Sequence, residues 1–204
     1  MTQGVLRFGW LLVIGSMASC ASGDTPSSFG AEPREIDVAT ASAPMKSAVE
    51  RADAAIAELQ RTLLTRLTET MGQGGPQAAV SVCRDEAQAL TQTVGTASGL
   101  TIGRTSHRVR NAANAPRPWA ADTVSAHAGR PVADAQPHVF DLGDRVGVLR
   151  PIGTQPMCLT CHGPRESIDT SIVDVLEGAY PDDRAVGFAP GDLRGWFWAE
   201  VALP

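Results

Sequence analysis

The stretch VERADAAIAELQRTLLTRLTETMGQGGP, residues 49–76, decides the first half of the fold. Its apolar residues recur at steps of three and four, the spacing that places them on one face of an α-helix. They are Val49, Ala52, Ile56, Leu59, Leu63, Leu67 and Met71. The GQGG run that follows is a helix stop signal, and Pro76 suits the first turn of a new helix. We therefore expect a long amphipathic helix, a break at residues 72–75, and a second helix.

The second helix also has an apolar stripe. Its members share one face at helical spacing: Ala79, Val80, Cys83, Ala87, Leu90 and Val94. We therefore expect the Cys83 side chain to face inward, where a free cysteine commonly behaves as a small buried hydrophobe.

Shorter elements are predicted after Gly99. They comprise a strand over 100–105, a loop-rich stretch with one small helix near 119–128, a hairpin of 137–142 and 145–152 around Gly143-Asp144, a helix over 170–176, and a last strand over 192–203. This order predicts an α+β domain with a small antiparallel sheet flanked by N-terminal helices.

The N-terminus has the grammar of an export signal, with Arg7 ahead of an apolar stretch and small residues around Cys20. The sequence predicts a signal peptide over residues 1–19, of the type in which Cys20 becomes lipidated, and then a flexible linker over 20–45 rich in Ser, Ala, Gly and Pro. The domain is expected over 46–204. We expect the protein in the periplasm, held to the outer or the inner membrane by lipid on Cys20.

The charge balance is mildly acidic, with 17 basic and 22 acidic residues. The sequence has no polybasic run of the kind that nucleic acid requires, so nucleic acid is not expected as a partner. The only membrane contact that we expect is the lipid on Cys20.

The segment CLTCHG, Cys158 to Gly163, is the candidate cofactor-binding motif of the sequence. Its two thiols are spaced to bond both vinyl groups of a haem, and His162 follows where its imidazole can reach the iron. Zinc would need further ligands that no second Cys/His pair supplies, and a thioredoxin-like dithiol would need a βαβ context. A structural disulfide would leave His162 unexplained. We expect one covalently attached haem c.

The motif and its spacing do not identify the second axial ligand of the haem iron. The candidates are His107, His127, His138, Met45, Met71, Met157 and Cys83. Cys83 differs from the others because it is the only cysteine, apart from Cys20, that haem attachment does not use. Arginines are the expected partners of the haem propionates, because a guanidinium matches carboxylate geometry. The candidates are Arg104, Arg108, Arg110 and Arg150, whereas Arg194 is expected to tie a turn to the last strand.

Four segments together resemble the Tll-type haem-c domain, a family first described as a domain of unknown function. They are AAVSVC (78–83), IGRTSHRVRNAANAPRPW (102–119), LRPIGTQPMCLTCHG (149–163) and YPDDRAVGFAPGDLRGWFWAEV (180–201). The resemblance covers about residues 47–202. It implies a PAS-like fold and a c-type haem bonded through Cys158 and Cys161, with His162 as proximal and Cys83 as distal ligand.

The expected function is electron transfer or redox sensing through the iron, with an unidentified redox partner or sensor protein. The first alternative is a gas sensor in which NO, CO or O₂ displaces the distal ligand, and the second is a zinc or dithiol protein without haem. No acid–base or nucleophile constellation points to an enzyme.

Overall fold

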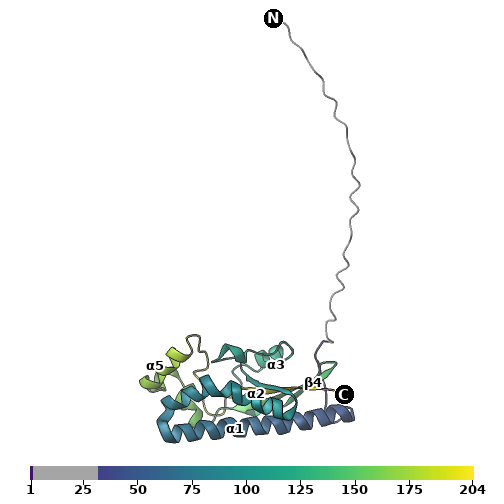
Figure 1. The fold of residues 1–204 in the computed structure, drawn as a ribbon, viewed down its shortest axis with the longest axis horizontal. Coiled ribbons are helices and arrows are strands. Elements are labelled where there is room, and N and C mark those ends of the chain that lie inside the picture. Colours follow the sequence, from purple (N-terminus) through teal and green to yellow (C-terminus); the bar gives the residue numbers. More distant parts are fainter. Residues whose placement is uncertain (2–31) are drawn as a thin grey trace.

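The computed structural model describes residue 1 and residues 32–204. Within this part the fold is α+β, as expected: two N-terminal helices lie along a five-stranded antiparallel sheet of order β1-β3-β4-β5-β2 (Figure 1). The helices and strands are β1 (Arg34–Glu35), α1 (Ala43–Ser81), η1 (Val82–Glu86), α2 (Ala87–Ser98), β2 (Thr101–Thr105), α3 (Ala121–Ala126), β3 (His138–Asp141), β4 (Arg145–Gly153), α4 (Leu159–His162), α5 (Thr170–Ala179) and β5 (Leu193–Ala202). Short 3₁₀ turns join several of them. No helix in this part of the chain is long and apolar enough to cross a membrane.

The expected break between the first two helices lies at Gly75. Its φ of +74° is not helical, and it divides α1 into a long first part and a short second part that begins with Pro76. A positive φ favours glycine, because a side chain there would meet its own backbone. The chain turns back at this point, and α2 lies beside α1 (Figure 1).

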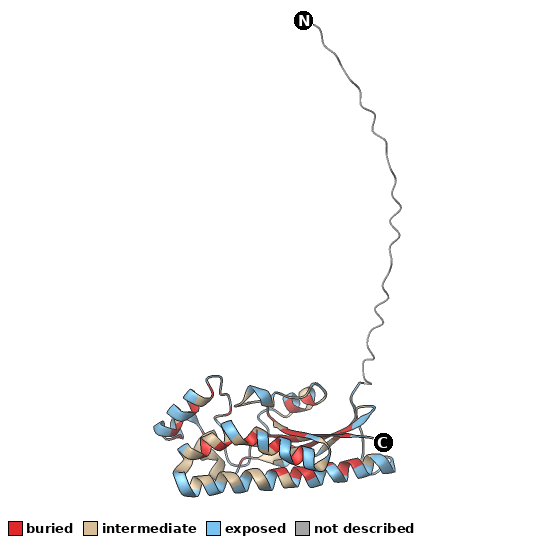
Figure 2. Cartoon of the chain, viewed as in Figure 1, coloured by how far each residue is buried: buried red, intermediate tan, exposed pale blue. Residues whose placement is uncertain are grey.

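The main core lies between these helices and one face of the sheet. The N-terminal half of α1 supplies the predicted stripe, including Val49, Ile56 and Leu59, which are almost fully buried. In the sheet, Val146 and Val148 face them, together with alternate residues of β5 such as Ala199. Burial is concentrated on the strands and on this half of α1, whereas the half toward Gly75 is more exposed (Figure 2).

A second core fills the other face of the sheet, under α3 and the loops around it. It is built around Trp196 and Leu149, with Phe140 and Trp198 packed beside them. The register brings Gly103 opposite Trp198, and a Cβ on Gly103 would lie 2.5 Å from the indole ring. Glycine is therefore required here for close packing.

The expected linker ends earlier than residue 45. Arg34 and Glu35 pair with β3, the Ile36 amide donates to the Val139 carbonyl at 2.9 Å, and α1 already begins at Ala43. Ile36 and Val38 pack against the main core, so a few apolar residues anchor a segment whose overall composition is that of a tether. The expected signal peptide, Cys20 and the first part of the linker lie outside the described residues.

Candidate functional site

Cys83 lies in η1, a π-helical turn between α1 and α2. The Ala87 amide donates to the Val82 carbonyl across this turn, so the helix is locally one residue wider than an α-helix. The Cys83 side chain is partly buried, so the apolar stripe predicted its face but not the widened turn. Single π-turns inside helices occur frequently at functional sites.

The CLTCHG segment folds as a 3₁₀ turn (Pro156–Cys158) that continues into α4. It ends at Gly163, whose amide donates to the Leu159 carbonyl at 3.0 Å. Cys158 and Cys161 are partly buried free thiols, and among the described residues no disulfide forms. The strand before this segment, β4, is antiparallel to its neighbours, so the segment lacks the βαβ setting of a thioredoxin-like dithiol.

The His162 ring is held by one of its two nitrogens. Nδ1 lies 2.7 Å from the Ala185 carbonyl oxygen, and a carbonyl can only accept, so Nδ1 carries the hydrogen and Nε2 keeps its lone pair. Burial, together with the charges of Arg194, Arg110 and Arg104, holds the pKa of His162 well below its ordinary value. A neutral imidazole with a carbonyl on its second nitrogen is the usual form of a metal-ligating histidine.

The three described cysteines are close enough to influence one another electrostatically. Burial raises the pKa of Cys161, and the negative charges that Cys83 and Cys158 can carry raise it further. Tyr180 is part of the same group: burial and Cys83 raise its pKa to about 12. Cys161 and Tyr180 also pack in one apolar cluster with Val80, one turn before Cys83. The fold thus brings the π-turn and the CLTCHG segment together.

Two arginines beside this group have no acidic partner. The Arg104 side chain makes no hydrogen bond or ion pair with any residue in the described part of the chain, and burial lowers its pKa. Arg194 lies over the Phe188 ring and donates only a long hydrogen bond, 3.4 Å, to the Arg108 carbonyl. Burial and the charges of Arg110 and Arg104 lower the pKa of Arg194 to about 10. The sequence predicted Arg104 here and assigned Arg194 a bracing role.

The other predicted arginines are already engaged. Arg108 lies over Phe188 and donates to the carbonyls of Val186 and Gly187, at the edge of the same region. Arg110 is neutralised by Asp183 at 2.9 Å and is described further below.

Arg150, the last predicted arginine, also has partners within the protein. Its Nε and Nη2 bind both carboxylate oxygens of Asp53 on α1, and its Nη1 donates to the carbonyls of His138 and Leu149. Arg150 therefore braces α1 against the sheet and supplies no free charge. Arg150 shares its sheet face with Arg104, but its guanidinium is engaged by Asp53.

The remaining histidines contact other groups. His127 and His138 pack on Trp196, on the sheet face opposite α1 and α2, and His138 Nδ1 lies 2.6 Å from Glu35. His107 packs against Phe188, and its Nε2 is buried without a hydrogen-bond partner. Across residues 32–204, no three His, Cys, Asp or Glu side chains come together as a metal-binding group. The zinc alternative therefore gains no support.

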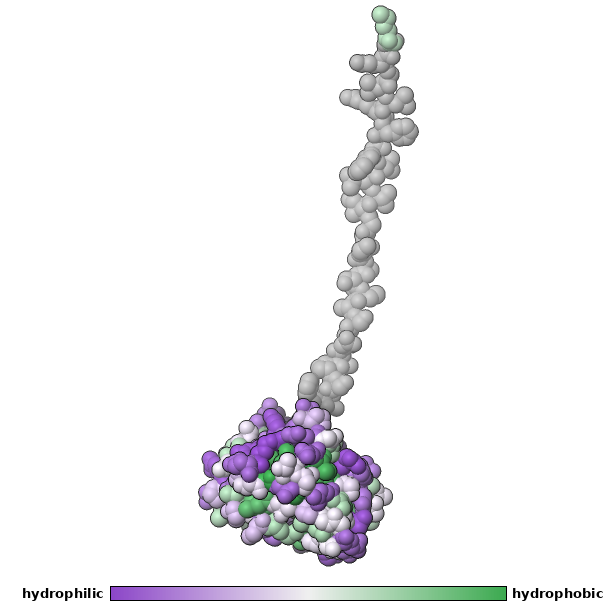
Figure 3. Space-filling view, turned by 90° about the vertical axis from the view of Figure 1, so that its left-hand side faces the viewer, coloured by the Kyte–Doolittle hydropathy of each residue, from purple (hydrophilic) through white to green (hydrophobic). Residues whose placement is uncertain are grey.

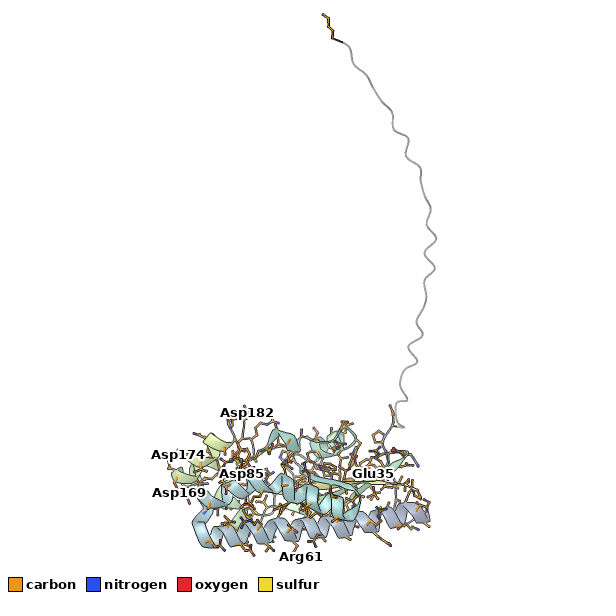
Figure 4. The ribbon with its side chains drawn as sticks, in the orientation of Figure 1. Glu35, Arg61, Asp85, Asp169, Asp174 and Asp182 are labelled. Carbon is orange, nitrogen blue, oxygen red and sulfur yellow. The ribbon has the colours of Figure 1, made fainter. Side chains whose placement is uncertain are left out.

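Carboxylates at the α5 end of the molecule do not compensate Arg104 and Arg194. Asp85, Asp169, Asp174 and Asp182 are all exposed at this end (Figure 4). Asp85 pairs with Arg84, and Asp169 accepts from the Ser171 amide as the cap of α5. The view onto this end shows apolar side chains grouped near the middle of the face, with polar ones around them (Figure 3).

Comparison with known proteins agrees with the fold. The sequence profile of a family described as Tll0287-like matches residues 39–202. The crystal structure of the cyanobacterial haem protein Tll0287 is similar, with a TM-score of 0.58 and 21% identity over 76% of this chain and 94% of that one. No curated protein sequence matches the chain at a significant level.

Proposed function

Because the chain belongs to the Tll0287-like family, we propose that it is an exported, cytochrome-like protein that binds one c-type haem and uses it to sense redox state or to transfer electrons. The observation that carries the proposal is the His162 ring, which directly follows two free thiols and has Nδ1 anchored and Nε2 available. The solved structure with the same fold is that of a haem protein. We propose no substrate turnover.

Cys158 and Cys161 would hold the haem covalently. Each thiol would form a thioether bond to one vinyl group of the haem, with the thiol hydrogen passing to the neighbouring vinyl carbon, so that no oxidant would be needed. Both thiols are free and partly exposed, which suits this addition.

His162 and Cys83 are the proposed iron ligands. His162 would bind through Nε2, and Cys83, beside Cys161 in the fold, would bind through its sulfur as a thiolate. An anionic sulfur ligand stabilises ferric over ferrous iron, so the bound haem would have a low reduction potential. Such an iron accepts and returns single electrons without a vacant coordination position.

The haem propionates would be held by Arg104 and Arg194. Each is a partly buried guanidinium that forms no ion pair within the described residues, although Asp183 offsets part of the charge of Arg194, and a haem carries two carboxylates. A fork of N–H donors meeting a carboxylate forms short, charge-assisted hydrogen bonds. The two propionates would thus offset the remaining positive charge of the two arginines.

The cellular setting rests on sequence alone. The signal peptide over residues 1–19 would deliver the chain to the periplasm, and lipid on Cys20 would anchor it to the outer or inner membrane. Haem c is attached in that compartment. The partner would be a redox protein or a sensor protein that reads the state of the iron.

Intact-mass analysis and a pyridine haemochrome spectrum test the haem. The full chain, exported in cells that assemble c-type haem, should carry one haem adduct with the c-type spectrum. The double variant Cys158→Ala/Cys161→Ala should lose it. A colourless wild-type product without the adduct would refute the proposal.

Cys83→Ser tests the distal ligand. The reduction potential should rise and the ferric spectrum should change, because a hydroxyl is a weaker, neutral ligand. An unchanged ferric spectrum would remove Cys83 from the coordination sphere.

Gas binding is the second candidate, because Cys83 is only partly buried and lies in a widened helical turn. Such a ligand can be displaced once reduction weakens the iron–sulfur bond. Titration of the ferrous protein with CO decides between the two: a ferrous spectrum that CO leaves unchanged excludes gas sensing and leaves electron transfer or redox sensing.

A further inference from the structure

The Ala185 carbonyl, which accepts the hydrogen bond from His162, has a second polar neighbour. Arg110 donates from Nη2 to this carbonyl at 3.3 Å and, from the same nitrogen, to the Cys161 carbonyl at 2.5 Å. Arg110 therefore contacts both the backbone that carries the second thiol and the oxygen that orients the imidazole.

Asp183 completes the arrangement. Its Oδ2 accepts from Arg110 Nε at 2.9 Å, and its Oδ1 accepts from the Ala185 amide at 2.7 Å. Both side chains are buried, at 9% and 7% exposure, and Ala185 is fully buried. We call Arg110, Asp183 and the carbonyls of Cys161 and Ala185 the Arg110 bracket.

The bracket joins segments that are far apart in sequence. The Gly187 amide donates to the Gly163 carbonyl and the Phe188 amide to the His162 carbonyl, so the loop after Asp183 runs alongside the end of α4. A buried arginine–carboxylate pair stabilises little by itself, because the desolvation of both charges offsets their attraction. What this pair does is fix the position of one carbonyl oxygen.

From this geometry we infer that Arg110 and Asp183 are positioning residues for His162: they fix the Ala185 carbonyl, which sets the tautomer and the direction of the imidazole ring. The inference rests on the proposed role of His162 as a haem ligand. The sequence suggested Arg110 as a propionate partner, whereas its Nε and Nη2 are engaged in the bracket.

The two charges of the bracket also act on the iron in opposite senses. A cation close to the site disfavours ferric iron, and it draws electron density from the Ala185 carbonyl, which weakens that oxygen as an acceptor from His162. Asp183 counteracts both effects. Removing either charge alone therefore unbalances the site in a direction that depends on which one is removed.

The first experiment measures reduction potentials of the haem-loaded full chain. Arg110→Gln should shift the potential downward, Asp183→Asn should shift it upward, and the double variant should lie between them. Arg150→Gln is the matched control, because Arg150 also binds one carboxylate and two carbonyls but lies away from His162; its potential should equal that of the wild type. A purely structural role would lower the stability of both bracket variants without opposite shifts. Shifts of the same sign, or no shift, would overturn the inference.

The second experiment needs no haem. In the full chain labelled with ¹⁵N-histidine, NMR should show His162 with its hydrogen on Nδ1, both in the wild type and in Arg150→Gln. In Arg110→Gln the Nδ1–H signal should weaken and exchange faster with water. A wild-type signal and exchange rate in Arg110→Gln would overturn the inference.

These experiments distinguish a failure of the proposed haem binding from a failure of the proposed role of the Arg110 bracket. If no variant and no wild-type protein takes up haem, the proposed function fails, and the NMR result still decides whether the bracket orients His162. If Arg110→Gln does not fold, Asp183→Asn decides through its potential: an upward shift supports the bracket, and any other result refutes it.

Discussion

Two groups of arginines lie along strand β5, one near each of its ends, and they differ in charge balance. Near its C-terminal end, Glu200 accepts hydrogen bonds from Arg117 at 2.8 Å, Trp119 at 2.7 Å and Arg145 at 3.4 Å. At its start, Arg194 lies near Arg104, and neither has a carboxylate partner in the described part of the chain. In the first group the protein itself supplies the carboxylate that the arginines bind. In the second group it does not, which is the charge pattern of a site that binds an anion.

The largest loss of stability is expected in the first group, on substitution of Glu200. Glu200→Leu would leave Trp119 and Arg117 without their acceptor, whereas Arg145 would keep its pair with Asp144, and the free energy of unfolding should fall by about 2 kcal/mol. Urea denaturation measures this. The comparison variant is Asp53→Asn, which weakens the more exposed pair with Arg150 and should lower stability by only about 0.5 kcal/mol. Equal losses in the two variants would contradict the special role of Glu200.

The pH dependence of the free energy of unfolding tests the second group through His107, which lies near Arg194. Burial, with Arg108 and Arg194, lowers the pKa of His107, and Asp192 opposes this only in part. Below about pH 6.5 the unfolded chain binds a proton that the folded chain does not. The free energy of unfolding should therefore fall as the pH falls through that range, by at most about 1.4 kcal/mol per pH unit from this group.

The control for this prediction is His107→Gln, which should make the pH profile less steep over the same range but not flat, because the pKa of His162 is also held below its ordinary value. Haem loading should also flatten it, because an anion beside Arg194 offsets part of the positive charge that acts on His107. An identical slope in wild type and His107→Gln would show that other groups cause the dependence.

The smallest change in the free energy of unfolding is expected at Arg104. The sign of this change should differ between the haem-free and the haem-loaded chain. In the haem-free chain, Arg104→Leu removes a poorly solvated charge, so the unfolding free energy should rise by about 1 kcal/mol. In the haem-loaded chain the same variant should lower it, because a propionate loses its partner. Unfolding of both forms by urea measures the difference. A loss of the same size in both forms would mean that Arg104 has only a structural role.

Local sequence signals predicted most of the fold. Three- and four-residue periodicity located the helices, Gly75 and Pro76 located the break, and Gly143-Asp144 located the hairpin between β3 and β4. These features depend on backbone preferences within a few residues. The early end of the linker was missed, because the two-residue strand β1 exists only through its pairing with β3.

The candidate site could be predicted only where its chemistry is contiguous. Cys158, Cys161 and His162 form a motif, whereas Arg110 and Asp183 lie 73 positions apart and meet only in the folded chain. Arg150 was one of the four candidate partners of the haem propionates, but its guanidinium binds Asp53 on α1. No pattern in the sequence distinguishes an arginine that has a partner from one that has none. The π-turn at Cys83 was not predicted, because the apolar stripe of the second helix follows regular α-helical spacing and does not indicate an extra residue in the turn.

The widened turn η1 also sets the direction of one side chain. A π-turn takes up one extra residue within the turn, so deleting one residue between positions 82 and 86 would restore α-helical winding and leave the helical faces on either side nearly unchanged. Thr91 and Val94, both buried in α2, would keep their present surroundings. The extra residue therefore affects the direction of the Cys83 side chain and not the packing of α2.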